Sequence, residues 1–175
     1  EQALEITPAG HERVAILQGA ARAARDALKL DQHLEYLREV VVLLGELEDV
    51  DAEVTALGVL AASLGDLNRL DELRAAVELL QARIGSTDDI LAHAEYEHAI
   101  GYLRYYEGDL DASMAAIDRS AAGYEKARAW DRCRRALVNR ANVLVNLGRH
   151  QESITLRRGM IAIAMEENDL RTAAV

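Results

Sequence analysis

Four side chains near the middle of the chain are spaced so that they share one face of a helix. They recur at intervals of three, four and three residues, and residues three or four apart are neighbours on a helical surface. They are Glu95, His98, Tyr102 and Tyr105. A second stripe of this kind consists of Arg135, Asn139 and Asn142. Because an Asn amide both donates and accepts hydrogen bonds, and a Tyr ring offers contact area at low entropy cost, these stripes indicate binding.

No other group of residues has the spacing that catalysis or metal binding needs. His93 and His98 are five residues apart, whereas two metal ligands on one helix face are three or four apart. Cys133 is the single cysteine and is expected to be a small buried residue, although the nearby arginines would favour a reactive thiolate. The phosphate-binding pattern G-x-x-x-x-G-K-[ST] does not occur. The sequence therefore predicts no enzymatic activity, no catalytic residue, no metal site and no cofactor.

Basic residues gather around one acid, Asp131, at the start of the second stripe. They are Lys126, Arg128, Arg132, Arg134, Arg135 and Arg140. One interpretation is the solvated start of a helix. The other is a patch that binds an acidic segment of a partner.

Aromatic residues are concentrated in the same part of the chain. Between residues 96 and 130 the chain carries Tyr96, Tyr102, Tyr105, Tyr106, Tyr124 and Trp130. They could fill the interface between neighbouring helices or form a binding surface. Tyr96 and Tyr106 lie on a different stripe from Tyr102, so at least these two are expected to pack in the core.

The composition indicates that helices position these residues. The chain has 175 residues, of which 50% are hydrophobic, and it contains one proline and no phenylalanine. Such a chain, rich in Ala, Leu, Glu and Arg, favours helix throughout.

The net charge of −10 argues against nucleic-acid binding, whose electrostatic term needs basic surface. No apolar run approaches the roughly 18 residues of a membrane span, and the lone cysteine fits a reducing compartment, so a cytoplasmic location is expected.

A small set of glycines punctuates the chain at similar intervals. Gly65, Gly108 and Gly148 are each preceded by a small residue seven positions earlier, which is about two helical turns. We expect each of these glycines to end a helix in the left-handed conformation, and Asp66 and Asp109 to cap the helix that follows. The recurrence predicts stacked helical hairpins.

The remaining turns complete this organisation. They fall near residues 46–51, 85–89, 126–132 and 166–170, each with an aspartate suited to capping, and Ser86 or Thr87 offers a further cap. The predicted helix pairs, which form a single array over residues 1–175, are 9–28 with 31–47, 50–64 with 67–84, 88–107 with 110–127, and 130–147 with 150–167. A ninth helix is expected near Asp169. The start, "EQALEITPAG", lacks a methionine and a signal segment, so we expect a piece of a larger protein. Neither end carries a polar cap, so the ends can self-associate.

The segment "NRANVLVNLGRHQESI" (139–154) resembles the tetratricopeptide repeat, with Ser113 and Ser153 at a small-residue position of that pattern. "ALEITP" (3–8) is similar to the end of such a repeat. The resemblance extends over the whole chain and implies a right-handed α-solenoid of about four hairpins. The period near 40 exceeds the usual 34 and is similar to the long repeats of bacterial MalT-like activators, signal-transducing ATPases and cyclase-linked proteins. Two departures are Leu70, where a small residue is expected, and Asp26, where a turn glycine is expected.

The resemblance also implies a function. In this family the first helix of each pair lines a concave groove, where Asn and basic residues hold a partner's backbone or carboxylate. The residues expected there are Glu95, His98, Tyr102, Tyr105, Arg135, Asn139 and Asn142. We therefore expect a protein- or peptide-binding module of a bacterial signalling or regulatory protein. The alternatives are a sensor whose groove binds a small molecule or signalling peptide, and a structural spacer.

Overall fold

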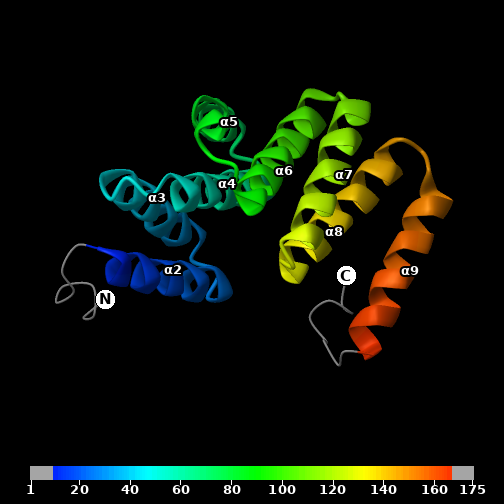
Figure 1. The fold of residues 1–175 in the computed structure, drawn as a ribbon. Coiled ribbons are helices and arrows are strands. Elements are labelled where there is room, and N and C mark those ends of the chain that lie inside the picture. Colours follow the sequence, from blue (N-terminus) through cyan, green and yellow to red (C-terminus); the bar gives the residue numbers. More distant parts are fainter. Residues whose placement is uncertain (1–9, 167–175) are drawn as a thin grey trace.

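The computed structural model describes residues 10–166, and over this range the chain is all-α, as predicted (Figure 1). No strand occurs among these residues. The helices are α2 (His11–Asp26), α3 (Leu30–Glu46), α4 (Val50–Asp66), α5 (Leu70–Arg83), α6 (Ile90–Glu107), α7 (Leu110–Lys126), α8 (Trp130–Asn146) and α9 (His150–Glu166), with a short 3₁₀ turn, η1 (Ile84–Ser86), after α5.

The helices are spaced evenly along the chain. From α3 to α9 each begins about 20 residues after the previous one, at residues 30, 50, 70, 90, 110, 130 and 150. The predicted helical ranges are confirmed to within about three residues at their ends. The helix expected near Asp169 lies outside the described residues. A pair of helices and its two turns therefore account for the 40-residue period that the glycine pattern indicated.

The turns repeat the same backbone geometry, but one glycine was assigned the wrong role. Positive φ angles occur at Leu28, Glu48, Asn68, Gly108, Arg128 and Gly148, again in steps of 20 or 40 residues. Gly108 (φ 82°) and Gly148 (φ 75°) adopt the left-handed conformation predicted for them. Gly65, in contrast, lies within α4, and Asn68 makes the turn. The matching turn positions are thus 68, 108 and 148.

The aspartate caps follow the prediction at some turns and not at others. Asp49 and Asp109 accept hydrogen bonds from the backbone N–H groups of Ala52 and Ala112, at 3.2 and 3.1 Å. At the turn of residues 85–89 the cap is Asp89, which accepts from Ala92 at 2.8 Å, and not Ser86 or Thr87.

The prediction for Asp66 was wrong. Asp66 is the last residue of α4, and the helix that follows has no side-chain cap. Its carboxylate instead accepts a hydrogen bond from Tyr102 of α6. A residue expected to serve a local turn therefore links two helices.

A hydrogen bond of the same kind joins consecutive helices at three of the turns. Ser113 donates to the carbonyl of Gly101 at 2.8 Å, and Ser153 donates to the carbonyl of Ala141 at 2.9 Å, 12 residues apart in both cases. Cys133 Sγ lies 3.7 Å from the carbonyl of Ala121, at the equivalent separation. Burial raises the pKa of the Cys133 thiol, which favours the packing role over the reactive one.

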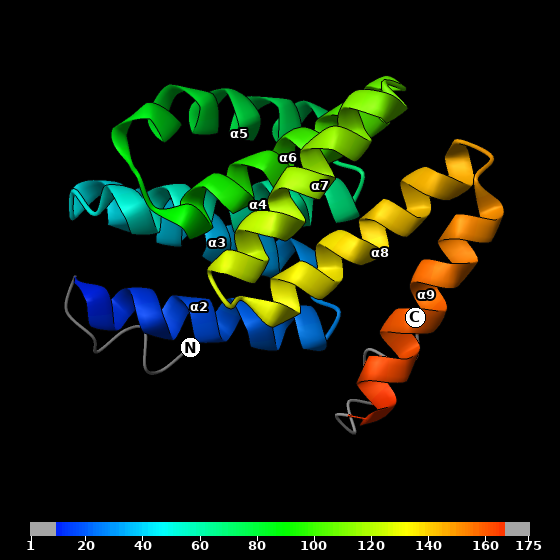
Figure 2. The same cartoon turned by 45° about the vertical axis from the view of Figure 1, so that its right-hand side comes forward.

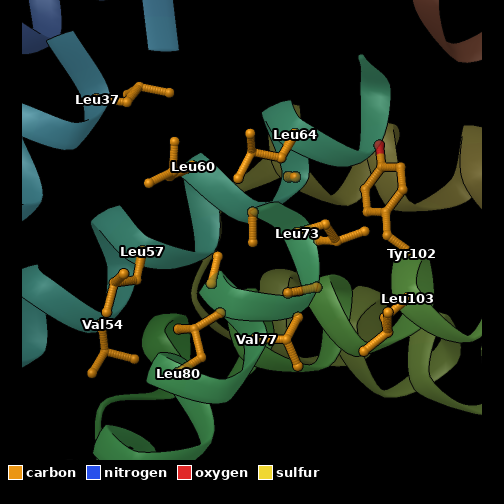
Figure 3. Packing of buried hydrophobic residues seen from close by; sticks show 14 of the residues in the cluster. Leu37, Val54, Leu57, Leu60, Leu64, Leu73, Val77, Leu80, Tyr102 and Leu103 are labelled. Atoms are coloured by element: carbon orange, nitrogen blue, oxygen red, sulfur yellow. The ribbon is translucent and has the colours of Figure 1, made fainter. Parts of the chain in front are cut away.

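Each helix packs mainly on its neighbours in sequence. Contacts join α2 to α3, α3 to α4, and so on to α9, and α4 also contacts α6. Figures 1 and 2 show the helices following one another across the molecule, from α2 at one end to α9 at the other. The largest apolar cluster draws on α2 to α6, and Figure 3 shows Leu64, Leu73 and Leu103 within it. A separate cluster containing Ile117 and Val143 joins α6, α7 and α8.

None of the helices between residues 10 and 166 combines the length and apolar character that crossing a membrane requires.

Candidate functional site

Two glycines of α4 determine how closely α6 approaches. A Cβ at Gly65 would lie 2.6 Å from Cδ1 of Tyr102, and a Cβ at Gly58 would overlap the Cβ of Glu95. The absence of these side chains lets α6 lie directly against α4. As a consequence, Glu95 is fully buried and Tyr102 is only 8% exposed. Sequence analysis found the small residue at 58 but not its partner on α6.

The seam between α6 and α8 is polar. Glu95 forms an ion pair with Arg132, and Asn139 Nδ2 donates to Nε2 of His98 at 2.8 Å. Further along, Asn146 Nδ2 donates to the Tyr105 hydroxyl at 3.0 Å. These bonds span 37 to 41 residues of sequence. The predicted stripes of α6 and α8 therefore face each other.

His98 holds this seam as a neutral imidazole. The ring is fully buried, and burial, followed by the charge of Arg135, lowers its pKa well below the ordinary value. Since Nε2 accepts from Asn139, the ring proton must lie on Nδ1, which is 3.2 Å from the Tyr124 hydroxyl. His98 thus fixes the position of Asn139.

The tyrosines of α6 are anchored to the end of α4. Tyr102 donates to Asp66, and Tyr106 donates to the carbonyl of Gly65 at 2.6 Å. Burial, and then the charge of Asp66, raises the pKa of both phenols, so both remain donors at neutral pH. Tyr105 and Tyr106 make an edge-to-face contact with ring centroids 5.4 Å apart.

A cleft of about 240 Å³ opens beside these rings. Its lining comes from α4, α6, α7 and α8 and consists of Asp66, Gly101, Tyr102, Tyr105, Tyr106, Ile117, Asn139, Asn142 and Val143. Among the described residues, Asn139 Oδ1 and Asn142 Nδ2 have no hydrogen-bond partner, whereas Asn142 Oδ1 accepts from Arg157 at 2.6 Å. An unused acceptor and an unused donor therefore lie three residues apart at this tyrosine cleft.

The structure places the seven residues predicted to line a groove in three different settings. Four of them line the tyrosine cleft: Tyr102, Tyr105, Asn139 and Asn142. Glu95 and His98 are fully buried behind it. Arg135 is partly buried, and within residues 10–166 its buried Nε has no hydrogen-bond partner; the same holds for Oε2 of Glu95. Burial opposes the charge of Arg135, but Glu95 and the nearby tyrosines raise its pKa overall.

Sequence analysis missed three residues of this site, and each for a different reason. Tyr106 was assigned to another stripe and Asp66 to a turn. Asn146 continues the stripe of Arg135, Asn139 and Asn142 by four more residues, so extending that stripe would have found it.

The basic cluster of α8 is largely paired with acids. Arg132 and Arg140 form ion pairs with Glu95 and Asp118, which lie on other helices, and Arg134 pairs with Asp131. The aromatic cluster contains both core residues and surface residues. Tyr124 is fully buried, whereas Trp130 is 53% exposed.

A second hollow of about 360 Å³ lies between α2, α3 and α4 and reaches Arg132 of α8. Its charged lining residues include Arg22, Arg25 and Arg132 as well as Asp51 and Asp89. Among the described residues no three His, Cys, Asp or Glu side chains are grouped as metal ligands.

The chain matches no model in a scan of protein families, and a search of curated proteins also gives no match.

Proposed function

We propose that this chain is a right-handed α-solenoid of four long tetratricopeptide-like hairpins that binds an extended peptide segment of a partner protein. It acts without catalysis, as the interaction module of a larger bacterial signalling or regulatory protein in the cytoplasm. Support for the solenoid comes from the 20-residue spacing of the helices and from the packing of α4 on α6, the first helices of successive pairs. The hydrogen bonds between α6 and α8 continue this relationship to the next pair.

The observation that carries the proposed function is the tyrosine cleft between α6 and α8. Its unused acceptor, Asn139 Oδ1, and unused donor, Asn142 Nδ2, match the alternating N–H and C=O groups of an extended peptide. The anchored rings of Tyr102 and Tyr105 supply apolar contact without further ordering. A rigid polar cleft of this kind favours a peptide over a featureless spacer surface.

The volume of the tyrosine cleft suits a single side chain of a peptide better than a whole small-molecule ligand. Sites for small molecules usually enclose about 300–1,000 Å³, and the tyrosine cleft encloses about 240 Å³. The sensor alternative has its support elsewhere, because the hollow beside α2, α3 and α4 measures about 360 Å³ and falls within that range.

Selection of peptides from a random phage-displayed library tests the proposed function. We expect the chain to enrich a family of related peptides. Asn142→Ala should lower the affinity for a synthetic member of that family by about tenfold, which corresponds to one or two lost hydrogen bonds. Fluorescence anisotropy measures the affinity. Asn139→Ala should weaken binding as well, with some loss of stability because Asn139 also contacts His98.

The matched control replaces two exposed amides away from the cleft, Gln81 on α5 and Gln151 on α9, with alanine. This double variant should bind as the parent chain does. Failure to enrich any peptide family, or equal losses in the control and in Asn142→Ala, would contradict the proposed function.

A further inference from the structure

We infer that the tyrosine cleft recognises a positively charged side chain, arginine or lysine, of the bound peptide, with Asp66 as its counter-charge. This inference rests on the proposed function, since it names the chemistry of the partner at the same site. It starts from the one charged residue that lines the cleft.

Asp66 has unused capacity to pair with a cation. One oxygen, Oδ1, accepts from Tyr102, and within residues 10–166 neither carboxylate oxygen takes part in an ion pair. By contrast, three arginines of α8, Arg132, Arg134 and Arg140, are already paired with acids other than Asp66. The carboxylate lies at the last residue of α4 and is solvent-exposed, so a partner can reach it.

Three aromatic rings share the cleft with this carboxylate. They belong to Tyr102, Tyr105 and Tyr106. Each hydroxyl group is hydrogen-bonded, in that order to Asp66, Asn146 and the Gly65 carbonyl. A cation within about 6 Å of the face of such a ring is attracted by about 0.5–2 kcal/mol. The rings are held in place before a ligand arrives, so little ordering opposes this attraction.

Among the residues that the structure describes, no cation lines the cleft. Its lining contains one acid and neither Lys nor Arg. The charge of Asp66 helps to raise the pKa of Arg135, but it does so less than Glu95, and Arg135 does not line the cleft. The remaining lining groups are amide, phenol and aliphatic, which suit the stem of a long basic side chain.

Two capped amino acids test the charge preference directly. N-acetyl-arginine amide and N-acetyl-citrulline amide have nearly the same shape, and only the first is charged. We expect two-dimensional NMR titrations to show about tenfold tighter binding of the arginine compound, because it adds a cation–π contact and an ion pair. The largest chemical-shift changes should occur at Tyr102, Tyr105 and Asp66. The lysine analogue, compared with norleucine, distinguishes the two basic side chains.

Asp66→Asn removes the charge but keeps an oxygen that accepts from Tyr102. It should lower arginine affinity about tenfold and leave citrulline affinity unchanged. The matched control is Asp88→Asn, which makes the same change in net charge at an exposed turn position that does not line the cleft. Equal binding of arginine and citrulline, or an equal effect of the two Asn variants, would overturn the inference.

The peptide selection separates this inference from the proposed function. If the enriched peptides share a basic position, and this preference disappears when the selection is repeated with Asp66→Asn, the result supports the proposed function and the inference. Enriched peptides without a basic position uphold the proposed function and overturn the inference. If no peptide is enriched, the proposed function fails, and the titrations with the capped amino acids still decide whether the tyrosine cleft prefers a cation.

Discussion

The ring of Tyr102 occupies the space that a side chain at position 65 would need. A Cβ on Gly65 would lie 2.6 Å from Cδ1 and 2.8 Å from Cγ of that ring. The hydroxyl of this ring donates to Asp66, and the neighbouring Tyr106 donates to the carbonyl of Gly65 itself. A glycine in the middle of a helix thus positions the phenol that lines the cleft.

Gly65→Ala is expected to lower the free energy of unfolding by about 1 kcal/mol. Overpacking a core lowers the free energy of unfolding by about 1–3 kcal/mol. Replacing a glycine inside a helix with alanine raises it by up to about 1 kcal/mol. Gly58→Ala should cost more, since its Cβ would also lie 3.2 Å from the backbone Cα of Glu95. Urea denaturation measures both changes.

Gly19→Ala is the control for these two variants. Gly19 also lies inside a helix, but no atom of the described residues is within 4 Å of the position that its Cβ would take. This substitution should raise the free energy of unfolding by about 0.5–1 kcal/mol. If Gly65→Ala stabilises the chain to the same degree, the close approach of α4 and α6 is not a constraint.

The stability of the chain should decrease as the pH falls below about 6.5, the ordinary pKa of histidine. Burial lowers the pKa of His98 and of His33 in the folded state, so the unfolded state binds more protons in this range. Each such group lowers the free energy of unfolding by up to about 1.4 kcal/mol per pH unit below 6.5. Urea denaturation between pH 5.5 and 7.5 measures the slope.

His98→Gln should reduce this pH dependence, whatever its effect on absolute stability. The matched control is His150→Gln, which makes the same substitution at an exposed position of α9. An unchanged slope for His98→Gln would show that the folded state accommodates a protonated imidazole at position 98.

Arg132→Ala should destabilise the chain by about 2–3 kcal/mol, because it leaves the fully buried Glu95 without its ion-pair partner. Glu95→Gln combined with Arg132→Ala should cost less than the sum of the two single variants, as a double-mutant cycle measures. Arg74→Ala, which removes a surface pair with Asp71, should cost less than about 1 kcal/mol. Strict additivity in the cycle would contradict coupling between Glu95 and Arg132.

Two buried serines of α7 should respond differently to replacement by alanine. Ser113 donates to the carbonyl of Gly101, so Ser113→Ala should cost about 1 kcal/mol. Ser120 is equally buried, but among residues 10–166 its hydroxyl has no partner. Ser120→Ala should therefore be neutral or stabilising, and thermal denaturation compares the two. Equal losses would mean that the hydrogen bond across the α6–α7 turn adds no stability.

The sequence by itself determined the helices and their period. Helix propensity, the aspartate caps at Asp49 and Asp109, and the left-handed glycines 108 and 148 all act over a few residues, so each can be read locally. The binding stripes were also predictable in part, because residues three or four apart must share a helix face. Extending the second stripe reaches Asn146 by the same rule.

Only the tertiary structure decided which residues of the stripes line the cleft. Gly65 and Asp66 have the local signature of a turn, yet both serve contacts with Tyr102 and Tyr106, 36 to 41 residues away. The burial of Glu95 likewise depends on the approach of α4 at Gly58. The physical reason is that burial and hydrogen-bond partners across helices are set by the packing of separate segments, and the residue pattern within one segment does not determine which side chains of another segment it meets.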